Sequence, residues 1–289
     1  MAGSAELNAQ DAVMAHPQPQ SIRARSDAPF YASFAILGST YVFLIVAMLV
    51  ADLGFTTSSH LWQALSSPEI RYAIKLSLIS CTITTILSLW TGVPLGYMLS
   101  RFQFPGKGAV DAILDIPIVL PPLVIGLSLL ILFQTPLFRA LDRAFPITYA
   151  VPSVILAQFA VACAFAVRTM RITFDQISPR GEQVALTLGC TRGQAFWMVV
   201  LPEARRGVLT AATLAWARSL GEFGPILIFS GATRLRTEVL STTVFLELSV
   251  GNIEAAVAVS LLMIAAAVIV LTLLRVVGSE SAFGKAIEP

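Results

Sequence analysis

The chain is short of charged residues. Only 12% of its 289 residues are Asp, Glu, Lys or Arg, whereas 56% are hydrophobic. A soluble domain carries about 25% charged residues, so about half of the usual charge is missing. That deficit is too large for a fold whose surface faces water, and it indicates an integral membrane protein. The net charge of +2 adds little, because the positions of the charges matter more.

Histidine and cysteine are also scarce, with two and three residues. His16 lies in a polar stretch and His60 lies between apolar runs, so no apolar run offers a histidine base for a nucleophile. Neither H-E-x-x-H nor C-x-x-C occurs. The P-loop pattern is missing as well, because Arg101 stands five residues before Gly106, where a glycine is needed. These absences argue against an enzyme, predict no metal or other cofactor, and leave any ATP hydrolysis to another subunit.

Long apolar runs are what the sequence has in abundance. A membrane-spanning helix needs about 20 largely apolar residues. Candidate spans fall at about 31–52, 73–99, 109–133, 151–170, 208–231 and 255–277. The second and third contain Pro and Gly, which bilayers tolerate where neighbouring helices satisfy the freed backbone groups. We therefore predict an all-α polytopic membrane bundle of about six transmembrane helices, with both termini on one side.

The distribution of Lys and Arg predicts which side that is. With a cytoplasmic N-terminus, 12 of the 19 Lys and Arg residues fall inside, six fall outside and one, Arg218, lies within a span. The positive-inside rule then places both termini in the cytoplasm.

The domain organisation follows from the same runs. Residues 1–29 are polar without an apolar period, which predicts a disordered cytoplasmic tail. Residues 30–69 form the first span and an outer loop, and this span is longer than the apolar core of a signal peptide. Residues 70–277 form the main transmembrane domain, and residues 278–289 form a cytoplasmic C-terminal tail.

The longest predicted cytoplasmic connection runs from about residue 168 to residue 207. Residues 182–188 have apolar side chains at helical spacing, and Gly189 stops that short helix. A second amphipathic turn follows and ends at Leu201-Pro202. By periodicity alone, the segment is either a rigid cytoplasmic knob or an interfacial helix whose aromatic residues anchor the bundle.

This connection resembles the cytoplasmic signature of binding-protein-dependent ABC permeases. The signature starts with Glu-Ala-Ala, has a Gly six positions after its Glu, and ends in Leu-Pro. Gly189 and Leu201-Pro202 fit this spacing, whereas Gln183 stands at the Glu position with Glu182 just before it. The resemblance implies that the segment docks on an ATPase subunit. The coupling residues that it implies are Glu182, Gln183, Val184, Ala185, Gly189, Leu201 and Pro202.

Further matches extend the resemblance over residues 70–277. The segment 94–107 is similar to the family's end of span two. The segments Ile116–Pro122 and Ala217–Gly224 are similar to the third-span and fifth-span motifs of molybdate and sulfate permeases. The resemblance implies a type I ABC importer transmembrane domain in the cell (inner or plasma) membrane. It implies a translocation path for molybdate, tungstate or sulfate, and partners comprising an ABC ATPase, an external solute-binding protein and a second permease chain, as a homodimer, with no nucleic acid.

Two alternatives stay open for the transported solute and the driving force. Residues 232–238 replace a Pro-Gly turn that many sulfate and molybdate members carry, which leaves uptake of another small solute open. A secondary carrier driven by an ion gradient is much less favoured. Such a carrier needs no large cytoplasmic segment, and its halves often show inverted symmetry, which is not visible in this sequence.

Two charged residues interrupt the apolar fifth span. Arg218 and Glu222 each cost about 2.5–3.5 kcal/mol on insertion scales. Their i,i+4 spacing lets them pair on one helix face. We interpret them as lining the translocation path or a gate, with a structural ion pair as the alternative. The candidate path or gate residues are Arg218, Gly221, Glu222, Phe223 and Gly224.

The outer connection at residues 232–254 carries five charged side chains. It is predicted to be either the face for an external binding protein or a plain solvated loop. The charged residues are Arg234, Arg236, Glu238, Glu247 and Glu254.

Overall fold

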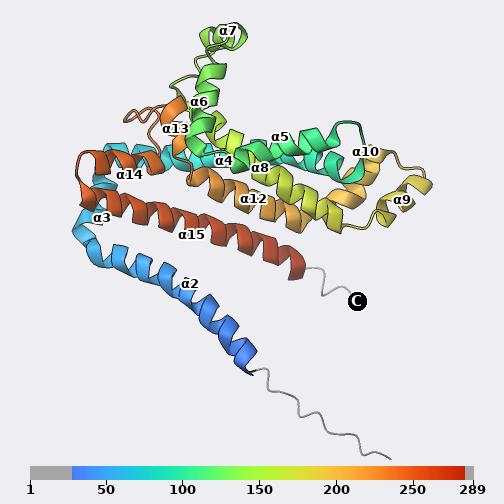
Figure 1. Cartoon of the computed structure of the whole chain (residues 1–289), viewed down its shortest axis with the longest axis horizontal. Coiled ribbons are helices and arrows are strands. Elements are labelled where there is room, and N and C mark those ends of the chain that lie inside the picture. Colours follow the sequence, from blue (N-terminus) through green and yellow to red (C-terminus); the bar gives the residue numbers. More distant parts are fainter. Residues whose placement is uncertain (1–27, 284–289) are drawn as a thin grey trace, which may run out of the picture. The chain divides into compact units, whose positions relative to one another are not determined.

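The computed structural model describes residues 28–283, and the two predicted terminal tails lie largely outside this range. The described residues form helices and connecting turns, with no strand among them (Figure 1). The helices are α2 (Ala28–Phe55), α3 (Ser58–Ser66), α4 (Pro68–Arg101), α5 (Lys107–Val119), α6 (Pro122–Leu132), α7 (Pro136–Ala144), α8 (Val151–Gln176), α9 (Arg180–Thr187), α10 (Arg192–Ala195), the π-helical turn η1 (Phe196–Val200), α11 (Leu201–Glu203), α12 (Arg205–Leu220), α13 (Gly224–Phe229), α14 (Leu240–Ser249) and α15 (Ile253–Phe283). The all-α prediction is confirmed.

Four described helices are long and apolar enough to cross a membrane: α2, α4, α8 and α15. The third predicted span is a bent pair, because α5 and α6 meet at 114° next to Pro121 and Pro122. The fifth predicted span is divided, since α12 ends at Leu220 and α13 begins at Gly224. The break has a local cause, because Pro225 has no N–H to donate to the carbonyl of Gly221, four residues earlier, and its ring would clash with that carbonyl in a continuous helix. Two of the six predicted spans are therefore broken rather than straight.

The chain divides into two compact units, one ending at Ala51 and one beginning at Asp52. The first unit contains most of α2. In this 28-residue helix the only charged residue is Asp52, beyond the unit's last residue. An apolar helix of this length suits the hydrocarbon thickness of a bilayer.

The core of the second unit is built from α4, α8 and α12, which pack against one another along their lengths. Their contact faces carry small residues, which allow close helix approach where no hydrophobic effect drives association. A Cβ added at Gly96 of α4 would lie 2.7 Å from the Met170 Cβ and 2.8 Å from the Arg171 backbone N of α8. These two helices are therefore in backbone contact near the end of α4.

The remaining helices surround this core. Helix α15 packs on α12 and α14, and α3 packs on α15. Helix α6 leaves the line of the long helices and packs on α13, with α7 beyond it (Figure 1). The segment that joins α8 to α12 lies at one end of the unit, while α3 and α14 lie at the opposite end.

Candidate functional site

The connection between α8 and α12, residues 177–204, forms a compact projection that we call the elbow. It contains α9, α10, η1 and α11. The elbow is shorter than the predicted connection 168–207, because α8 continues to Gln176 and α12 already begins at Arg205. Hydropathy marks where apolar residues stop, whereas these helices continue beyond that point with polar side chains.

The turn inside the elbow depends on Gly189 and Thr191. Gly189 has φ +93°, a conformation that residues with a side chain rarely adopt, and its N–H donates to the Leu186 carbonyl at 3.1 Å. Thr191 then caps α10. Its hydroxyl accepts from the Gln194 N–H, while the Gln194 side chain accepts from the Thr191 N–H. The prediction that Gly189 ends the first short helix is confirmed.

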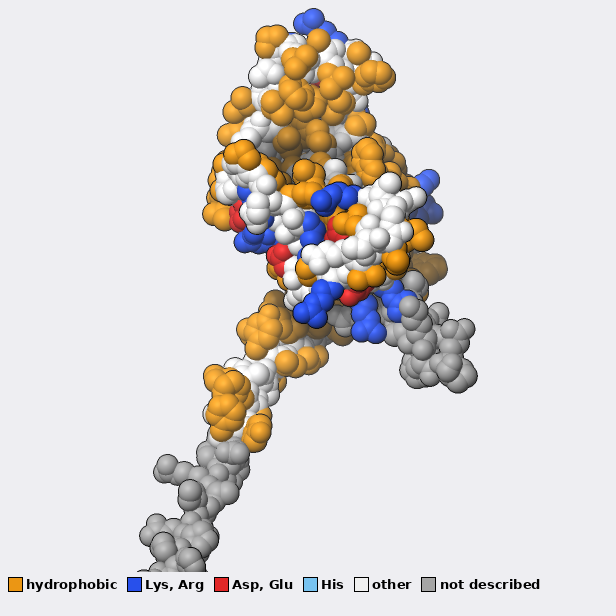
Figure 2. All heavy atoms as spheres, turned by 90° about the vertical axis from the view of Figure 1, so that its right-hand side faces the viewer, with side chains coloured by type: hydrophobic (Ala, Val, Ile, Leu, Met, Phe, Trp, Pro, Cys, Tyr) orange, Lys and Arg blue, Asp and Glu red, His pale blue; other side chains and the backbone are white. Residues whose placement is uncertain are grey.

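The elbow presents apolar side chains outward. Val184 is 56% exposed, Leu188 is 79% exposed and Trp197 is 68% exposed. Gln183 and Gly189 are exposed as well. Figure 2 views this end of the unit, where hydrophobic side chains lie among Lys and Arg side chains. These side chains give the elbow an exposed apolar surface bordered by charged side chains.

Other predicted coupling residues face inward. Glu182 is 7% exposed and Ala185 is 7% exposed, so neither is accessible to another subunit in this structure. Pro202 is exposed and Leu201 is half-buried within α11. The predicted coupling set therefore divides: Gln183 and Val184 lie on the surface, whereas Glu182 and Ala185 pack against the protein's own helices.

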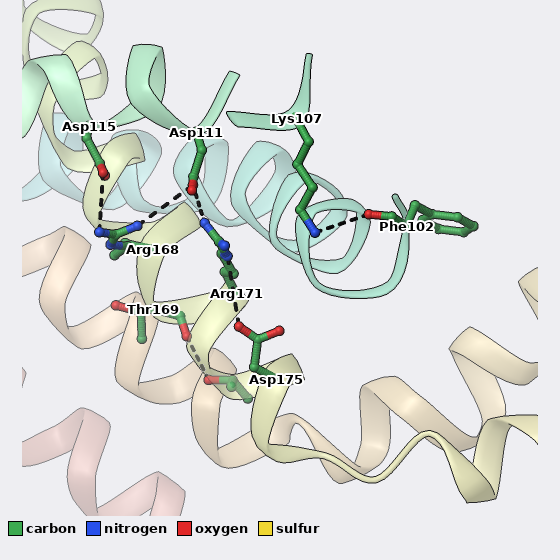
Figure 3. A network of polar contacts seen from close by, with 9 residues as sticks. Phe102, Lys107, Asp111, Asp115, Arg168, Thr169, Arg171 and Asp175 are labelled. Carbon is green, nitrogen blue, oxygen red and sulfur yellow. Dashed lines mark hydrogen bonds and ion pairs between the residues drawn. The ribbon is translucent and has the colours of Figure 1, made fainter. Parts of the chain in front are cut away.

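A network of charged side chains joins α5 to α8 at the elbow end (Figure 3). Asp111 pairs with both Arg171 and Arg168, and Arg168 also pairs with Asp115 at 3.2 Å. Arg171 reaches Asp175 one turn further along α8, at 3.9 Å. Two carboxylates of α5 and two guanidiniums of α8 thereby hold the otherwise exposed α5 on α8. No local sequence pattern predicts this network, because its α5 and α8 members lie about 60 residues apart in the chain.

The second candidate site lies where α12 breaks. Arg218 and Glu222 form an ion pair with an N–O distance of 2.8 Å, as their spacing predicted. Glu222 is 1% exposed, and its carboxylate makes no hydrogen bond beyond this pair among the described residues. The Arg218 guanidinium lies over the Phe165 ring at 5.6 Å. The neutralising partner of Glu222 is therefore a single side chain.

This break lies against the bend between α5 and α6. A Cβ added at Gly224 would lie 3.0 Å from the Leu123 backbone N, and a Cβ added at Gly126 would lie 2.8 Å from the Pro225 Cα. Gly221 is exposed at the end of α12, and the Phe223 ring lies 5.2 Å from the Phe245 ring. Two interrupted helices thus cross at glycine contacts, next to the buried ion pair.

Gln158 of α8 holds the last turn of α12. Its Nε2 donates to the Ser219 carbonyl at 3.2 Å, and its Oε1 accepts from the Thr84 hydroxyl at 3.2 Å. The Ser219 carbonyl also accepts from the Glu222 N–H at 3.2 Å, so the amide adds a second hydrogen bond to an acceptor at the end of the helix. The role of Gln158 was not predictable from the sequence, since an isolated amide in an apolar run belongs to no motif.

The predicted outer connection, residues 232–254, is more structured than a solvated loop. Half of it is helix α14, and Glu238 is fully buried. Burial raises the pKa of the Glu238 carboxyl above its ordinary value. Arg234 pairs with Glu247 at 2.8 Å beside a cavity of about 440 Å³, at whose rim His60 meets Glu254 at 3.2 Å. Among the described residues, no group of three or more His, Cys, Asp or Glu side chains fits a metal ion.

The geometry defines a multi-helix membrane protein with a surface-exposed elbow and two broken spans. Residues 92–279 match the family described as binding-protein-dependent transport system inner membrane component. The chain belongs to this family of membrane permeases. It is therefore a multi-pass membrane protein.

Relatives with assigned functions extend over most of the chain. The sulfate transport system permease protein CysT of Escherichia coli (strain K12) is 31% identical over 258 residues, which cover 86% of this chain and 92% of that protein. The molybdate/tungstate transport system permease protein WtpB of Thermococcus kodakarensis is 35% identical over 198 residues, covering 68% of this chain and 76% of that protein.

Solved structures share the fold at low sequence identity. One is a bacterial alginate ABC transporter in complex with an alginate pentasaccharide-bound periplasmic protein. It has a TM-score of 0.70 and 16% identity, and the match covers 86% of this chain and 94% of that chain. The MetNI methionine ABC transporter in inward-facing conformations gives a TM-score of 0.54. The predicted fold of an ABC importer transmembrane domain is confirmed.

Proposed function

We propose that this chain is the permease subunit of an ATP-driven importer and forms the translocation path for an oxyanion: sulfate, molybdate or tungstate. The main support is the similarity, over most of the chain, to permeases named for these three anions. The chain itself carries no P-loop pattern, so a separate ATPase subunit supplies the energy.

The elbow is the proposed docking surface for that ATPase. Its position in the chain coincides with the signature that the sequence resembles, and it offers Val184, Leu188 and Trp197 as exposed apolar side chains. Burial of such side chains at an interface is favourable because it removes apolar surface from water. The elbow is accordingly cytoplasmic, and so are both termini.

A second copy of this chain and an external solute-binding protein complete the proposed assembly. The solved alginate transporter was captured with a periplasmic protein, which supports a binding protein as a partner. The outer connection, with Arg234, Glu247 and the cavity beside them, is the proposed face for that protein. ATP and the loaded binding protein would together bias the permease between inward-facing and outward-facing states.

The broken helix is the proposed gate. Glu222 and Arg218 lie at the break of α12, and Gly224 contacts the bend before α6. Helix segments interrupted in mid-membrane place polar groups on a path through the bilayer, which is how many transporters form their solute route.

A charge placed on the elbow tests the docking proposal. Leu188→Arg puts a guanidinium on the exposed patch without disturbing the core, since Leu188 is 79% exposed. We expect the variant to insert normally but to lose most of the ATPase subunit that co-purifies with tagged wild-type permease. Leu137→Arg is the matched control, because Leu137 is 76% exposed on α7, away from the elbow. Equal ATPase yields from both variants would refute the docking surface.

The solute and the driving force are tested in proteoliposomes containing the permease, its ATPase and its binding protein. Uptake of radiolabelled sulfate, molybdate and tungstate is compared with and without ATP. We expect ATP-dependent uptake of at least one of these anions. Uptake that persists without ATP or the ATPase would indicate an ion-gradient carrier, and ATP-dependent uptake of an unrelated solute alone would refute the oxyanion assignment.

A further inference from the structure

Glu182 is buried although most residues of its helix, α9, are exposed. It occupies the first turn of α9, where its neighbours Gln183 and Val184 point outward. Its Oε1 accepts a hydrogen bond from the Tyr97 hydroxyl at 2.5 Å, and its Oε2 lies 3.6 Å from the Arg101 Nε. The carboxylate is therefore held by two side chains of another helix, 85 residues earlier in the chain at Tyr97.

Both partners come from the last turns of α4, the second of the long apolar helices. Tyr97 and Arg101 are four residues apart and so lie on one face of that helix. The Arg101 guanidinium also donates to the Ile177 carbonyl at 2.8 Å, where α8 passes into the elbow. One arginine thus binds the beginning of the elbow and its first helix together.

The Tyr97 ring reinforces the same connection through aromatic contacts. It packs edge-on against Phe196 of η1 at 4.8 Å and against Phe174 of α8 at 5.6 Å. Gly96, the residue just before Tyr97, brings α4 into backbone contact with α8. The Glu182 carboxylate of the elbow is therefore joined to the Arg101 guanidinium and the Tyr97 side chain of α4. Close packing at Gly96 in turn joins α4 to α8.

We infer that Glu182 is a positioning residue that transmits displacement of the elbow to α4, rather than a contact residue for the ATPase. This inference rests on the proposed function, in which an ATPase moves the elbow. Val184 and Leu188 receive the partner on the outer side of α9, and Glu182 holds the inner side to the bundle. A charge-assisted hydrogen bond is short and directional, so it transmits a displacement of the elbow to α4. An apolar contact would instead let the two elements slide past each other.

The test uses the reconstituted complex of permease, ATPase and binding protein. Tyr97→Phe removes one hydroxyl, Glu182→Gln removes the charge, and the double variant combines them. Tyr72→Phe is the matched control, because Tyr72 is on the same helix and its hydroxyl donates to the Arg236 carbonyl at the opposite end, at 3.0 Å. The readouts are ATPase co-purification, melting temperature, ATP hydrolysis with and without loaded binding protein, and solute imported per ATP.

We expect Tyr97→Phe and Glu182→Gln to retain the ATPase subunit and the basal hydrolysis rate. Stimulation by loaded binding protein, and solute imported per ATP, should fall about tenfold, the effect of losing one charge-assisted bond from the coupled state. The double variant should be no worse than the worse single variant, because both act on one linkage. Tyr72→Phe should match wild type in ATPase co-purification, basal hydrolysis and solute imported per ATP, because its hydroxyl contacts the outer connection and not the elbow.

Three results would overturn the inference. Loss of ATPase binding in Glu182→Gln but not in Tyr97→Phe would make Glu182 a contact residue. Unchanged import per ATP in both variants would show that the linkage transmits nothing. A lowered melting temperature with unchanged import per ATP would reduce the linkage to a stabilising contact. Failure of the wild-type permease to bind any ATPase would instead refute the proposed function, so the two failures are distinguishable.

Discussion

The elbow and the break of α12 each bury a glutamate beside an arginine, but the two buried carboxylates are neutralised in different ways. Glu182 accepts a hydrogen bond from Tyr97 and pairs with Arg101, on a helix that is distant in sequence. Glu222 pairs with Arg218 of its own segment, and its carboxylate has no further hydrogen bond among the described residues. The first carboxylate joins two elements, whereas the second is neutralised within one.

The difference indicates what each region does during a transport cycle. A buried charge with several partners from another helix keeps those helices together, because separating them would strand the charge. A buried charge whose partner lies four residues away keeps that partner wherever the segment moves. We therefore expect the elbow to move together with α4, and the broken helix to change its position while Arg218 and Glu222 stay paired.

The largest effect is expected from Arg218→Met, which leaves Glu222 buried without a partner. Breaking a buried pair in this way costs about 3–5 kcal/mol. Thermal unfolding in detergent should show a much less stable protein, and uptake should be abolished. Arg180→Met is the control for the unfolding measurement only, because Arg180 is exposed and its loss leaves no buried charge unpaired.

The double variant Arg218→Met with Glu222→Gln sharpens the same comparison. It should recover part of the stability, since the stranded charge is gone. If Arg218→Met alone were no less stable than Arg180→Met, Glu222 would have another partner, and the contrast with Glu182 would fail.

A smaller effect is expected from a methyl group at the helix crossing. The Cβ of Gly126→Ala would lie 2.8 Å from the Pro225 Cα and 3.0 Å from the Pro225 carbonyl, both of them backbone atoms. Overpacking of this kind costs about 1–3 kcal/mol, and it should slow transport by separating α6 from α13.

Gly193→Ala provides the matched substitution in the elbow. A Cβ at Gly193 meets nothing within 4 Å, so alanine should stabilise α10 by about 0.4–1 kcal/mol. Melting temperatures of the two variants should therefore move in opposite directions. Equal shifts would mean that the crossing at Gly126 is not tightly packed.

The most local effect is expected from Thr191→Ala, which removes the side-chain cap of α10. Loss of such a cap costs about 1 kcal/mol, confined here to the elbow. Hydrogen exchange should quicken over residues 191–200, while exchange at the α12 break stays the same. Faster exchange at both places would show that elbow and break loosen as one unit, contrary to the comparison.

Much of the fold was predictable because local patterns specify it. Apolar runs located the long helices, and the i,i+4 spacing predicted the Arg218–Glu222 pair. The stop at Gly189 followed from its residue type, since only glycine adopts φ +93° without strain. Hydropathy alone does not locate the break in the fifth span, because apolar residues continue on both sides of Gly221–Gly224 although the helix does not.

The sequence by itself determined the membrane setting, the positions of the long helices and the elbow with its exposed apolar residues, because hydropathy and helix-stop signals act over a few neighbouring residues. Only the tertiary structure decided that Glu182 turns inward to Tyr97, that Gln158 caps Ser219, and that Asp111 binds Arg171. Those partners lie about 60 to 85 residues apart, and no local pattern records which helices become neighbours.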